Sequence, residues 1–364
     1  MAGRFLAAMA VLFGLAGGPA QAQAVLNIYN WNDYVSPQAI ERFQRETGIR
    51  VRYDTYDSNE TLDAKLRAGR SGYDLVVPTA SPFLAQQLPA RLYREFDRAK
   101  LPNFANLDPQ VMRELERADP GNRFAVPHMS SMTGIGYNAE RVARIMADAP
   151  VFSLRMIFDP DVARRFQACG IVVLDSPTDV FPAALAYLGL PPDSKEPEHL
   201  TRATEALMRI RPFVRKWHGS EYINDLANGD ACLAFGYSGD IKQAAARAAE
   251  SKRANVRIEF AVPQEGALLS HDVWAIPADA RNVDAAHRFV DFMLRPEIAA
   301  LNSDAVGYPT AVPAARALVR PDLRDDPTVF VPPEIRAKLY TVTPAARDYE
   351  RLRTRAWTRV TTGR

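Results

Sequence analysis

The residues in this sequence that are best suited to chemistry are aspartates that lie beside aromatic side chains. These pairings are Asp33 between Trp31 and Tyr34, Asp240 three residues after Tyr237, and Asp272 two residues before Trp274. A carboxylate accepts charge-assisted hydrogen bonds from an ammonium group, each worth about 1.5–3 kcal/mol. An aromatic face attracts a cation by about 0.5–2 kcal/mol. The pattern suits an organic di- or polycation, although an aspartate near an aromatic residue is also typical of a solvated turn.

Motifs for catalysis and metal binding are weaker. Residues 236–239 (GYSG) do not match the G-x-S-x-G pattern of a nucleophile elbow. The five histidines form no H-E-x-x-H motif and no i,i+4 pair. His128 and His271 are each possible general bases, so a hydrolase that uses Asp and His is the enzymatic alternative. Two cysteines without a nearby histidine cluster make a poor metal site, and we expect neither a metal nor a cofactor.

Composition narrows the class of protein further. The chain has 364 residues, with 45 Lys and Arg against 43 Asp and Glu. This balance argues against a nucleic-acid binder that relies on bulk charge. The length favours two domains, and 24% charged and 47% apolar residues are typical of a globular protein.

The N-terminus has the pattern of a secretory signal peptide. Arg4 precedes an apolar run, and small residues with an A-x-A site at residues 22–24 follow. We therefore assign residues 1–24 to a signal peptide, expect export, and expect no stable membrane insertion. Export permits a disulfide between Cys169 and Cys232, although two buried thiols remain the alternative. A bridge would close a loop of about 63 residues and add roughly 4 kcal/mol of stability.

The elements that must position these side chains alternate between strand and helix. Strands are expected at residues 26–29, 49–53 and 73–77, with helices from 37 to 47 and from about 60 to 68. This order predicts a parallel sheet, in which ligands lie beyond the carboxyl ends of the strands. The loops at residues 30–34 and 79–81 follow two of those ends.

Later segments point to a second lobe. Residues 134–138 are expected to cross into it, with strands near 170–174 and 231–236. Strands at 256–263 and 272–277 are expected to return to the first lobe, followed by a helix at 285–294. The arginine-rich stretch from residue 336 is expected to form a solvated helix with a frayed tail.

At these stretches the sequence resembles a known family. It is similar to the periplasmic polyamine-binding proteins, the putrescine- and spermidine-binding components of ABC importers, and most of all to the putrescine-binding branch. The stretches that carry the resemblance are residues 29–34 (YNWNDY), 53–60 (YDTYDSNE), 73–81 (YDLVVPTAS), 133–138 (TGIGYN), 222–230 (YINDLANGD) and 353–360 (RTRAWTRV).

The resemblance implies an α/β, two-lobed periplasmic binding protein type II fold with the ligand in the interlobe cleft. Lobe 1 would comprise residues 25–133 and 261–305, and lobe 2 residues 134–260 and 306–364. The implied function is capture of a linear di- or polyamine by lobe closure and delivery to an inner-membrane ABC permease. A monomer in the periplasm is expected. A sensor or scaffold that binds the same amine is the alternative.

The resemblance also implies a set of ligand-binding residues, with Asp33 on one ammonium group and rings flanking the methylenes. The set is Trp31, Asn32, Asp33, Tyr34, Thr79, Ser81, Asp179, Tyr237, Asp240, Ser270, Asp272 and Tyr308. Cys169 and Cys232 match a cysteine pair that the family can bridge.

Several positions depart from the putrescine-binding branch. Asp179 stands where that branch has a glutamate, Tyr237 replaces a tryptophan, and Ser270 replaces a phenylalanine. Thr79 and Asn32 both stand at serine positions. We therefore expect a ligand that is longer or more polar than putrescine, or weaker binding of putrescine. His271 stands at an expected aromatic position, and its cation is expected to compete with the amine below about pH 6.

Overall fold

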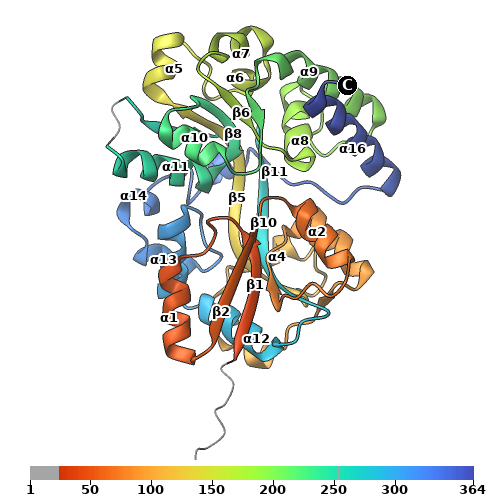
Figure 1. Cartoon of the computed structure of the whole chain (residues 1–364), viewed down its shortest axis with the longest axis vertical. Coiled ribbons are helices and arrows are strands. Elements are labelled where there is room, and N and C mark those ends of the chain that lie inside the picture. The colour runs from red at the N-terminus through yellow and green to blue at the C-terminus, as the bar shows by residue number, and fades with distance from the viewer. Residues whose placement is uncertain (1–23, 253–254) are drawn as a thin grey trace, which may run out of the picture.

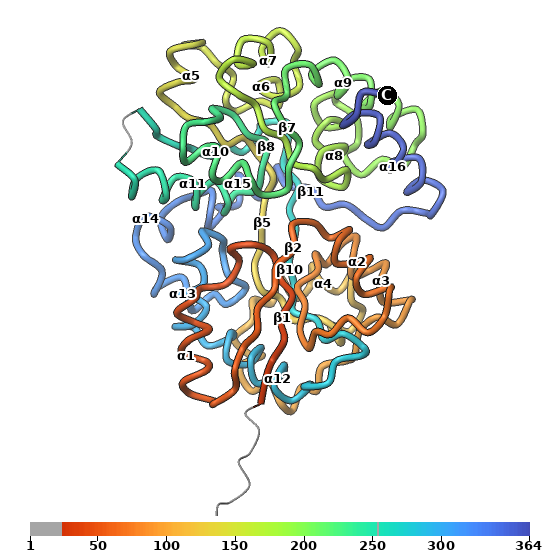
Figure 2. Tube along the Cα trace, in the orientation of Figure 1, coloured from red at the N-terminus to blue at the C-terminus, as the bar shows by residue number. Residues whose placement is uncertain are grey.

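Two long antiparallel strands, β5 (Ala125–Asn138) and β10 (Ala267–Pro277), connect the two lobes of the molecule (Figure 1). In this computed structural model, residues 24–252 and 255–364 are described, so the expected signal peptide lies outside them except for Ala24. The first half of β5 packs in the core of lobe 1, and its second half packs in the core of lobe 2. Figure 2 shows both strands running between the lobes.

Lobe 1 is built on the expected parallel strands. β1 (Val25–Trp31) pairs in parallel with β2 (Arg50–Tyr56) and β3 (Leu75–Val76). Between β1 and β2, α1 (Pro37–Thr47) has proline in its first turn and ends at Gly48, whose φ of 70° is the left-handed conformation that glycine favours. The prediction of alternating strands and helices in a parallel sheet is confirmed, and the carboxyl ends of these strands face lobe 2.

Lobe 2 has a second group of strands that continues the same sheet. β8 (Leu233–Tyr237) pairs antiparallel with β5 and parallel with β6 (Ile171–Val173), which pairs with β7 (Lys216–Trp217). β9 (Ile258–Ala261) pairs with the second half of β5. The expectation that residues 256–263 return to lobe 1 is therefore wrong. Only β10 makes that return among the described strands.

The remaining helices pack around this sheet, and the two remaining short strands pair with β10. Those packed with lobe 1 are α2 (Asn59–Arg67), α3 (Ala85–Gln87), β4 (Tyr93–Arg94), α4 (Pro109–Leu115), α12 (Val283–Met293), α13 (Pro296–Val306) and α14 (Pro321–Arg324). Those packed with lobe 2 are α5 (Ala139–Ile145), α6 (Arg155–Phe158), α7 (Pro160–Phe166), α8 (Pro177–Tyr187), α9 (Pro197–Ile210), α10 (Tyr222–Asn228), α11 (Ser238–Glu250), α15 (Pro333–Arg336), β11 (Leu339–Tyr340) and α16 (Arg347–Thr362).

The C-terminal residues divide between the lobes. Tyr308, Val312 and Val329 are buried in the core of lobe 1, so the expected assignment of residues 306–364 to lobe 2 is wrong for its first part. Helix α16 does pack on lobe 2, where it buries Trp357 and Val360. It is therefore anchored by an apolar face, because burial of large side chains favours docking over solvation.

Candidate functional site

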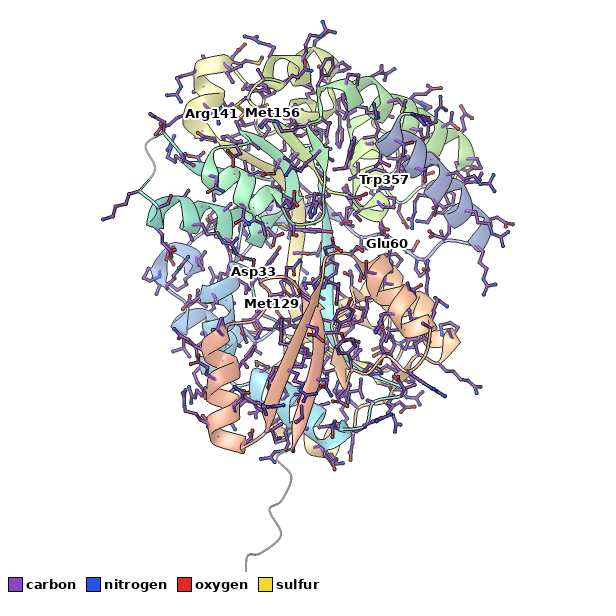
Figure 3. The ribbon with its side chains drawn as sticks, viewed as in Figure 1. Asp33, Glu60, Met129, Arg141, Met156 and Trp357 are labelled. Carbon is purple, nitrogen blue, oxygen red and sulfur yellow. A yellow bond between two sulfur atoms is a disulfide. The ribbon has the colours of Figure 1, made fainter. Side chains whose placement is uncertain are left out.

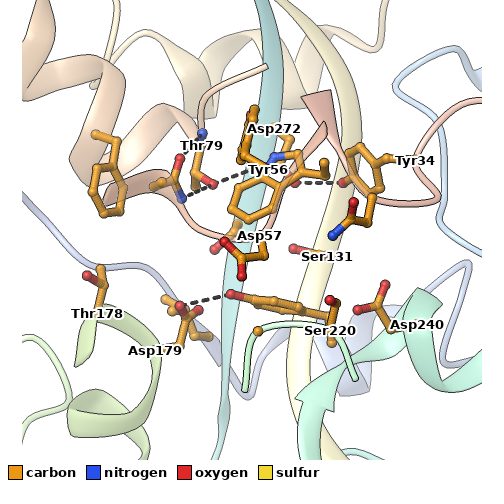
Figure 4. A pocket seen from close by; sticks show the side chains of 18 of the residues that line it. Tyr34, Tyr56, Asp57, Thr79, Ser131, Thr178, Asp179, Ser220, Asp240 and Asp272 are labelled. Atoms are coloured by element: carbon orange, nitrogen blue, oxygen red, sulfur yellow. Dashed lines mark hydrogen bonds between the residues drawn. The ribbon is translucent and has the colours of Figure 1, made fainter. Parts of the chain in front are cut away.

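A cavity lies between the lobes, beside the crossing strand β10 (Figure 4). Every residue of the expected ligand-binding set except Asp33 lines it. From lobe 1, the carboxyl ends of β1 and β3 supply Trp31 and Thr79. From lobe 2, the first turns of α8 and α11 supply Asp179 and Asp240. The cavity thus lies beyond the carboxyl ends of β1 and β3, where a parallel sheet is expected to bind its ligands.

Asp272 lies on β10 and is 6% exposed. Its two carboxylate oxygens accept hydrogen bonds of 2.6 Å each, one from the Tyr34 hydroxyl and one from Thr79 Oγ1. The Thr79 hydroxyl is itself held by Asn59, whose Nδ2 donates to it at 2.9 Å. This chain of donors fixes the orientation of the Asp272 carboxylate.

Asp240 lies in the first turn of α11, where the helix dipole favours a negative charge. Its carboxylate accepts a 2.6 Å hydrogen bond from the Tyr308 hydroxyl and a second one from the Tyr222 hydroxyl. Tyr308 comes from the core of lobe 1 and Tyr222 from the core of lobe 2. Residues of both lobes therefore hold this carboxylate.

Asp179 lies in the first turn of α8 and accepts hydrogen bonds from Ser176 Oγ and, at 3.0 Å, from the Tyr237 hydroxyl. A tyrosine at position 237 carries a hydroxyl that needs a hydrogen-bond partner, which a tryptophan there would lack. Asp179 is that partner. The two positions that are expected to depart from the putrescine-binding branch thus contact each other in the cavity wall.

The three carboxylates are buried, and no described lysine or arginine forms an ion pair with them. The charge of Arg353 acts on Asp179 and that of Arg247 acts on Asp240. These two arginines form their ion pairs with Glu350 and Asp33 instead. Burial raises the pKa of Asp179 and of Asp240 to about 6, and their hydrogen bonds offset only part of that rise. Burial also raises the pKa of Asp272. A buried, uncompensated negative charge costs free energy that a bound cation would recover.

Aromatic rings line the remaining wall. The rings of Trp31 and Tyr56 lie 4.8 Å apart, and those of Tyr34 and Tyr308 lie 5.1 Å apart. The indole of Trp31 is held by a 3.0 Å hydrogen bond from Nε1 to the Val77 carbonyl. Fixed rings beside carboxylates give a site that can bind both an ammonium group and an alkyl chain.

Asp33 does not line the cavity, so its expected contact with a ligand ammonium is not supported. Its backbone is left-handed, with a φ of 51°, and Figure 3 labels it near the boundary between the lobes. There the carboxylate pairs with Arg247 of α11 at 2.7 Å. Because Asp33 follows β1 and Arg247 lies in lobe 2, this ion pair joins the lobes at the surface.

His271 also lies outside the cavity. It stands between Ser270 and Asp272 on β10, and successive side chains of a strand point to opposite faces. Its ring contacts Ser130 Oγ at 2.8 Å and Glu114 Oε2 at 2.9 Å on the other side of the sheet. Burial alone would raise the pKa of Glu114, but hydrogen bonds from His271 and Arg336 lower it to about 2. The expected competition between His271 and the ligand therefore loses its geometric basis.

Several cavity residues were missed by the sequence analysis. They include Tyr56 at the end of β2, Asp57 and Asn59 after it, Thr178 beside Asp179, and the pair Gly219 and Ser220 before α10. The first three stand at or just after the end of a parallel strand, so the reasoning applied to β1 and β3 would have found them. Nothing in the local sequence signalled the pair before α10.

The two cysteines form a disulfide, with their Cα atoms 5.6 Å apart. It joins the residues just before β6 and just before β8 within lobe 2, which settles the alternative between a bridge and free thiols. Among the described residues there is no cluster of three or more potential metal ligands. No helix in the same ranges is long and apolar enough to cross a membrane.

Comparison with known proteins places the chain in a family. The model of the bacterial extracellular solute-binding proteins matches residues 38–331. The chain belongs to this family. It is 47% identical to the putrescine-binding periplasmic protein SpuD of Pseudomonas aeruginosa over 97% of this chain and 96% of the relative. It is 45% identical to the putrescine-binding periplasmic protein PotF of Escherichia coli over 99% and 97% of the two chains.

Solved structures of such solute-binding proteins have the same two-lobed fold. The spermidine/putrescine ABC transporter substrate-binding protein PotD of Streptococcus pneumoniae superposes with a TM-score of 0.74 at 26% identity. The superposition covers 93% of this chain and 99% of that one. The expected fold and the expected resemblance to polyamine-binding proteins are therefore confirmed.

Proposed function

We propose that this solute-binding protein captures a linear aliphatic di- or polyamine of the putrescine or spermidine kind in the periplasm and delivers it to an ABC permease. The observation that carries the proposal is the set of buried carboxylates Asp179, Asp240 and Asp272, which lack a cationic partner in the described protein and lie among aromatic rings. The putrescine-binding relatives support the same ligand class.

Closure of the lobes provides the mechanism. Without ligand, carboxylates of lobe 2 and of the crossing strand repel each other and oppose closing. A dication neutralises them and contacts both lobes, so it raises the population of the closed state. Two bound ammonium groups with ring contacts can give a micromolar Kd, which is a binding free energy of about −8 kcal/mol. This value includes the entropy lost when the ligand and the site become ordered.

A calorimetric titration of the purified protein with putrescine, cadaverine, spermidine and agmatine tests the proposal. At least one of these amines should bind at micromolar affinity or better. An absence of heat and of a thermal shift across the whole set would overturn it. The departures at Asp179, Tyr237 and Ser270 favour a ligand longer or more polar than putrescine, and strongest binding of putrescine at nanomolar affinity would refute that preference.

Binding without chemical conversion is part of the proposal. The hydrolase alternative needs a general base at the ligand, and His128 and His271 both lie outside the cavity lining. The ring of His128 packs on Trp274, and burial lowers its pKa to about 4.

The sensor or scaffold alternative needs the same closure of the lobes. Capture of the permease on the immobilised, amine-loaded protein distinguishes transport from this alternative. A monomer in solution is proposed for the transporting form.

A further inference from the structure

We propose that Asp57 is a further ligand-binding carboxylate, and that it lets the site prefer an amine with three positive charges over a diamine. This inference rests on the proposed function and adds a specificity-determining residue to it. Asp57 follows the carboxyl end of β2 and lines the cavity. Figure 4 shows its carboxylate pointing into the cavity between Tyr56 and Ser220.

The surroundings of Asp57 differ from those of the buried carboxylates. Asp179, Asp240 and Asp272 each accept two hydroxyl hydrogen bonds from the protein. The Asp57 carboxylate is exposed, and within residues 24–252 and 255–364 it has no hydrogen bond or ion pair. All of its acceptor capacity is therefore free for a ligand, and an ionised carboxylate can accept several N–H donors.

The position of Asp57 ties it to closure. A Cβ atom built on Gly219 would lie 2.5 Å from the Asp57 carbonyl oxygen, so the segment before α10 in lobe 2 lies directly against this residue. Asp57 itself belongs to lobe 1. Its carboxylate is thus brought over the ligand when the lobes meet, and it adds a negative charge to the site at that moment.

A second, independent observation points to a ligand group beyond the three buried aspartates. Thr178 lines the cavity and is 3% exposed. Its Oγ1 atom is buried and has no hydrogen-bond partner among the described residues. Such a group is costly to leave unsatisfied, and an N–H donor of the occupant would satisfy it.

These groups together exceed what a diamine can use. A diamine carries two cationic ends, while the cavity offers three buried carboxylates, the free Asp57 carboxylate and an unsatisfied hydroxyl. A linear triamine brings a third charge and additional N–H donors. Its extra ammonium group is the one that pairs with Asp57.

Titration calorimetry with spermidine and putrescine on an Asp57→Asn variant tests this assignment. The Kd for spermidine should rise at least about fivefold, and that for putrescine by less than about twofold. Asp57→Glu, which keeps the charge, should retain the preference. Asp54→Asn is the matched control, because this variant removes the same charge from the neighbouring strand β2. The Asp54 carboxylate accepts a hydrogen bond from the Tyr73 hydroxyl outside the cavity.

Equal losses for both amines, or no loss for either, would overturn the role of Asp57 and leave the proposed function standing. A wild-type protein that binds neither spermidine nor putrescine would overturn this inference, and one that also binds neither cadaverine nor agmatine would overturn the proposed function as well. A selective loss for spermidine in Asp57→Asn but not in Asp54→Asn would support the assignment.

Discussion

The hydroxyl of Tyr308, which packs in the core of lobe 1, donates a 2.6 Å hydrogen bond to Asp240 at the start of α11 in lobe 2. The backbone N–H of Asp240 donates in return to the Tyr308 oxygen at 3.2 Å. One tyrosine therefore both joins the lobes and prepares a carboxylate for a cation.

Removal of this hydroxyl should weaken amine binding. In Tyr308→Phe, Asp240 loses one of its two hydroxyl donors, and a hydrogen bond to a charged group is worth about 1.5–3 kcal/mol. We expect the Kd measured by calorimetry at pH 7.5 to rise about tenfold. Tyr73→Phe is the control, since Tyr73 makes the same contact with Asp54 at the surface. A similar effect in both variants would count against the role of Tyr308.

Neutralising Asp240 should have a stronger effect than neutralising Asp33. Asp240→Asn removes a buried charge from the cavity, and we expect a loss of affinity of at least about tenfold. Asp33→Asn removes an exposed ion pair with Arg247, which is worth about 1 kcal/mol or less. Its Kd should change by no more than about fivefold. A reversed order of the two effects would restore Asp33 as a ligand group.

Ligand affinity should fall in mild acid. Because Asp179 and Asp240 have a pKa of about 6 in the ligand-free protein, both become protonated as the pH falls through that value. We expect the Kd to rise at least about tenfold between pH 7 and pH 5. His271→Gln should show the same pH profile, because His271 faces away from the cavity. A flattened profile in that variant would assign the acid sensitivity to the histidine instead.

The stability of the ligand-free protein should show the opposite trend. The usual pKa of an aspartate is 3.8, and that of Asp179 and of Asp240 in the folded protein is about 6. At a pH between these two values, the folded state holds protons on the two carboxylates that the unfolded chain has released. Their contribution to the free energy of unfolding is present below that window and is lost as the pH rises through it. Between pH 4.5 and pH 7, the melting temperature should therefore fall less in an Asp179→Asn, Asp240→Asn double variant than in the wild-type protein. An unchanged slope would contradict the raised pKa values.

Loss of the disulfide should lower stability without abolishing binding. The bridge closes a separation of 63 residues, for which the loop-entropy relation gives about 4 kcal/mol. A Cys169→Ser, Cys232→Ser double variant should melt at a clearly lower temperature and keep its Kd within about twofold. A large change in Kd at a temperature where the variant is fully folded would show that the bridge also shapes the cavity.

The parts of the fold that were predictable are those set by local signals. The start of α1 after Ser36, its end at Gly48 and the alternation of strands and helices follow from capping and hydrophobic period. The partner of β9 was not predictable in the same way, because pairing with β5 is a contact between distant segments. The same holds for residues 306–329, whose apolar side chains suit the core of either lobe.

The cavity was largely predictable because aspartates and aromatic residues cluster at strand and helix ends. Asp33 was misplaced because residue type does not reveal its left-handed backbone, which turns the carboxylate toward Arg247. The position of His271 could have been derived from strand alternation once Ser270 and Asp272 were assigned to the cavity. Asp57 was overlooked although it stands at a strand end like the residues that were chosen.

The disulfide lies wholly inside one half of the molecule, and neither β5 nor β10 is tethered by it. Oxidation therefore stabilises lobe 2 without linking it covalently to lobe 1. A change in the redox state of the surroundings should therefore alter the lifetime of the folded protein. The proposed opening of the lobes, which would release the ligand, should not depend on the disulfide.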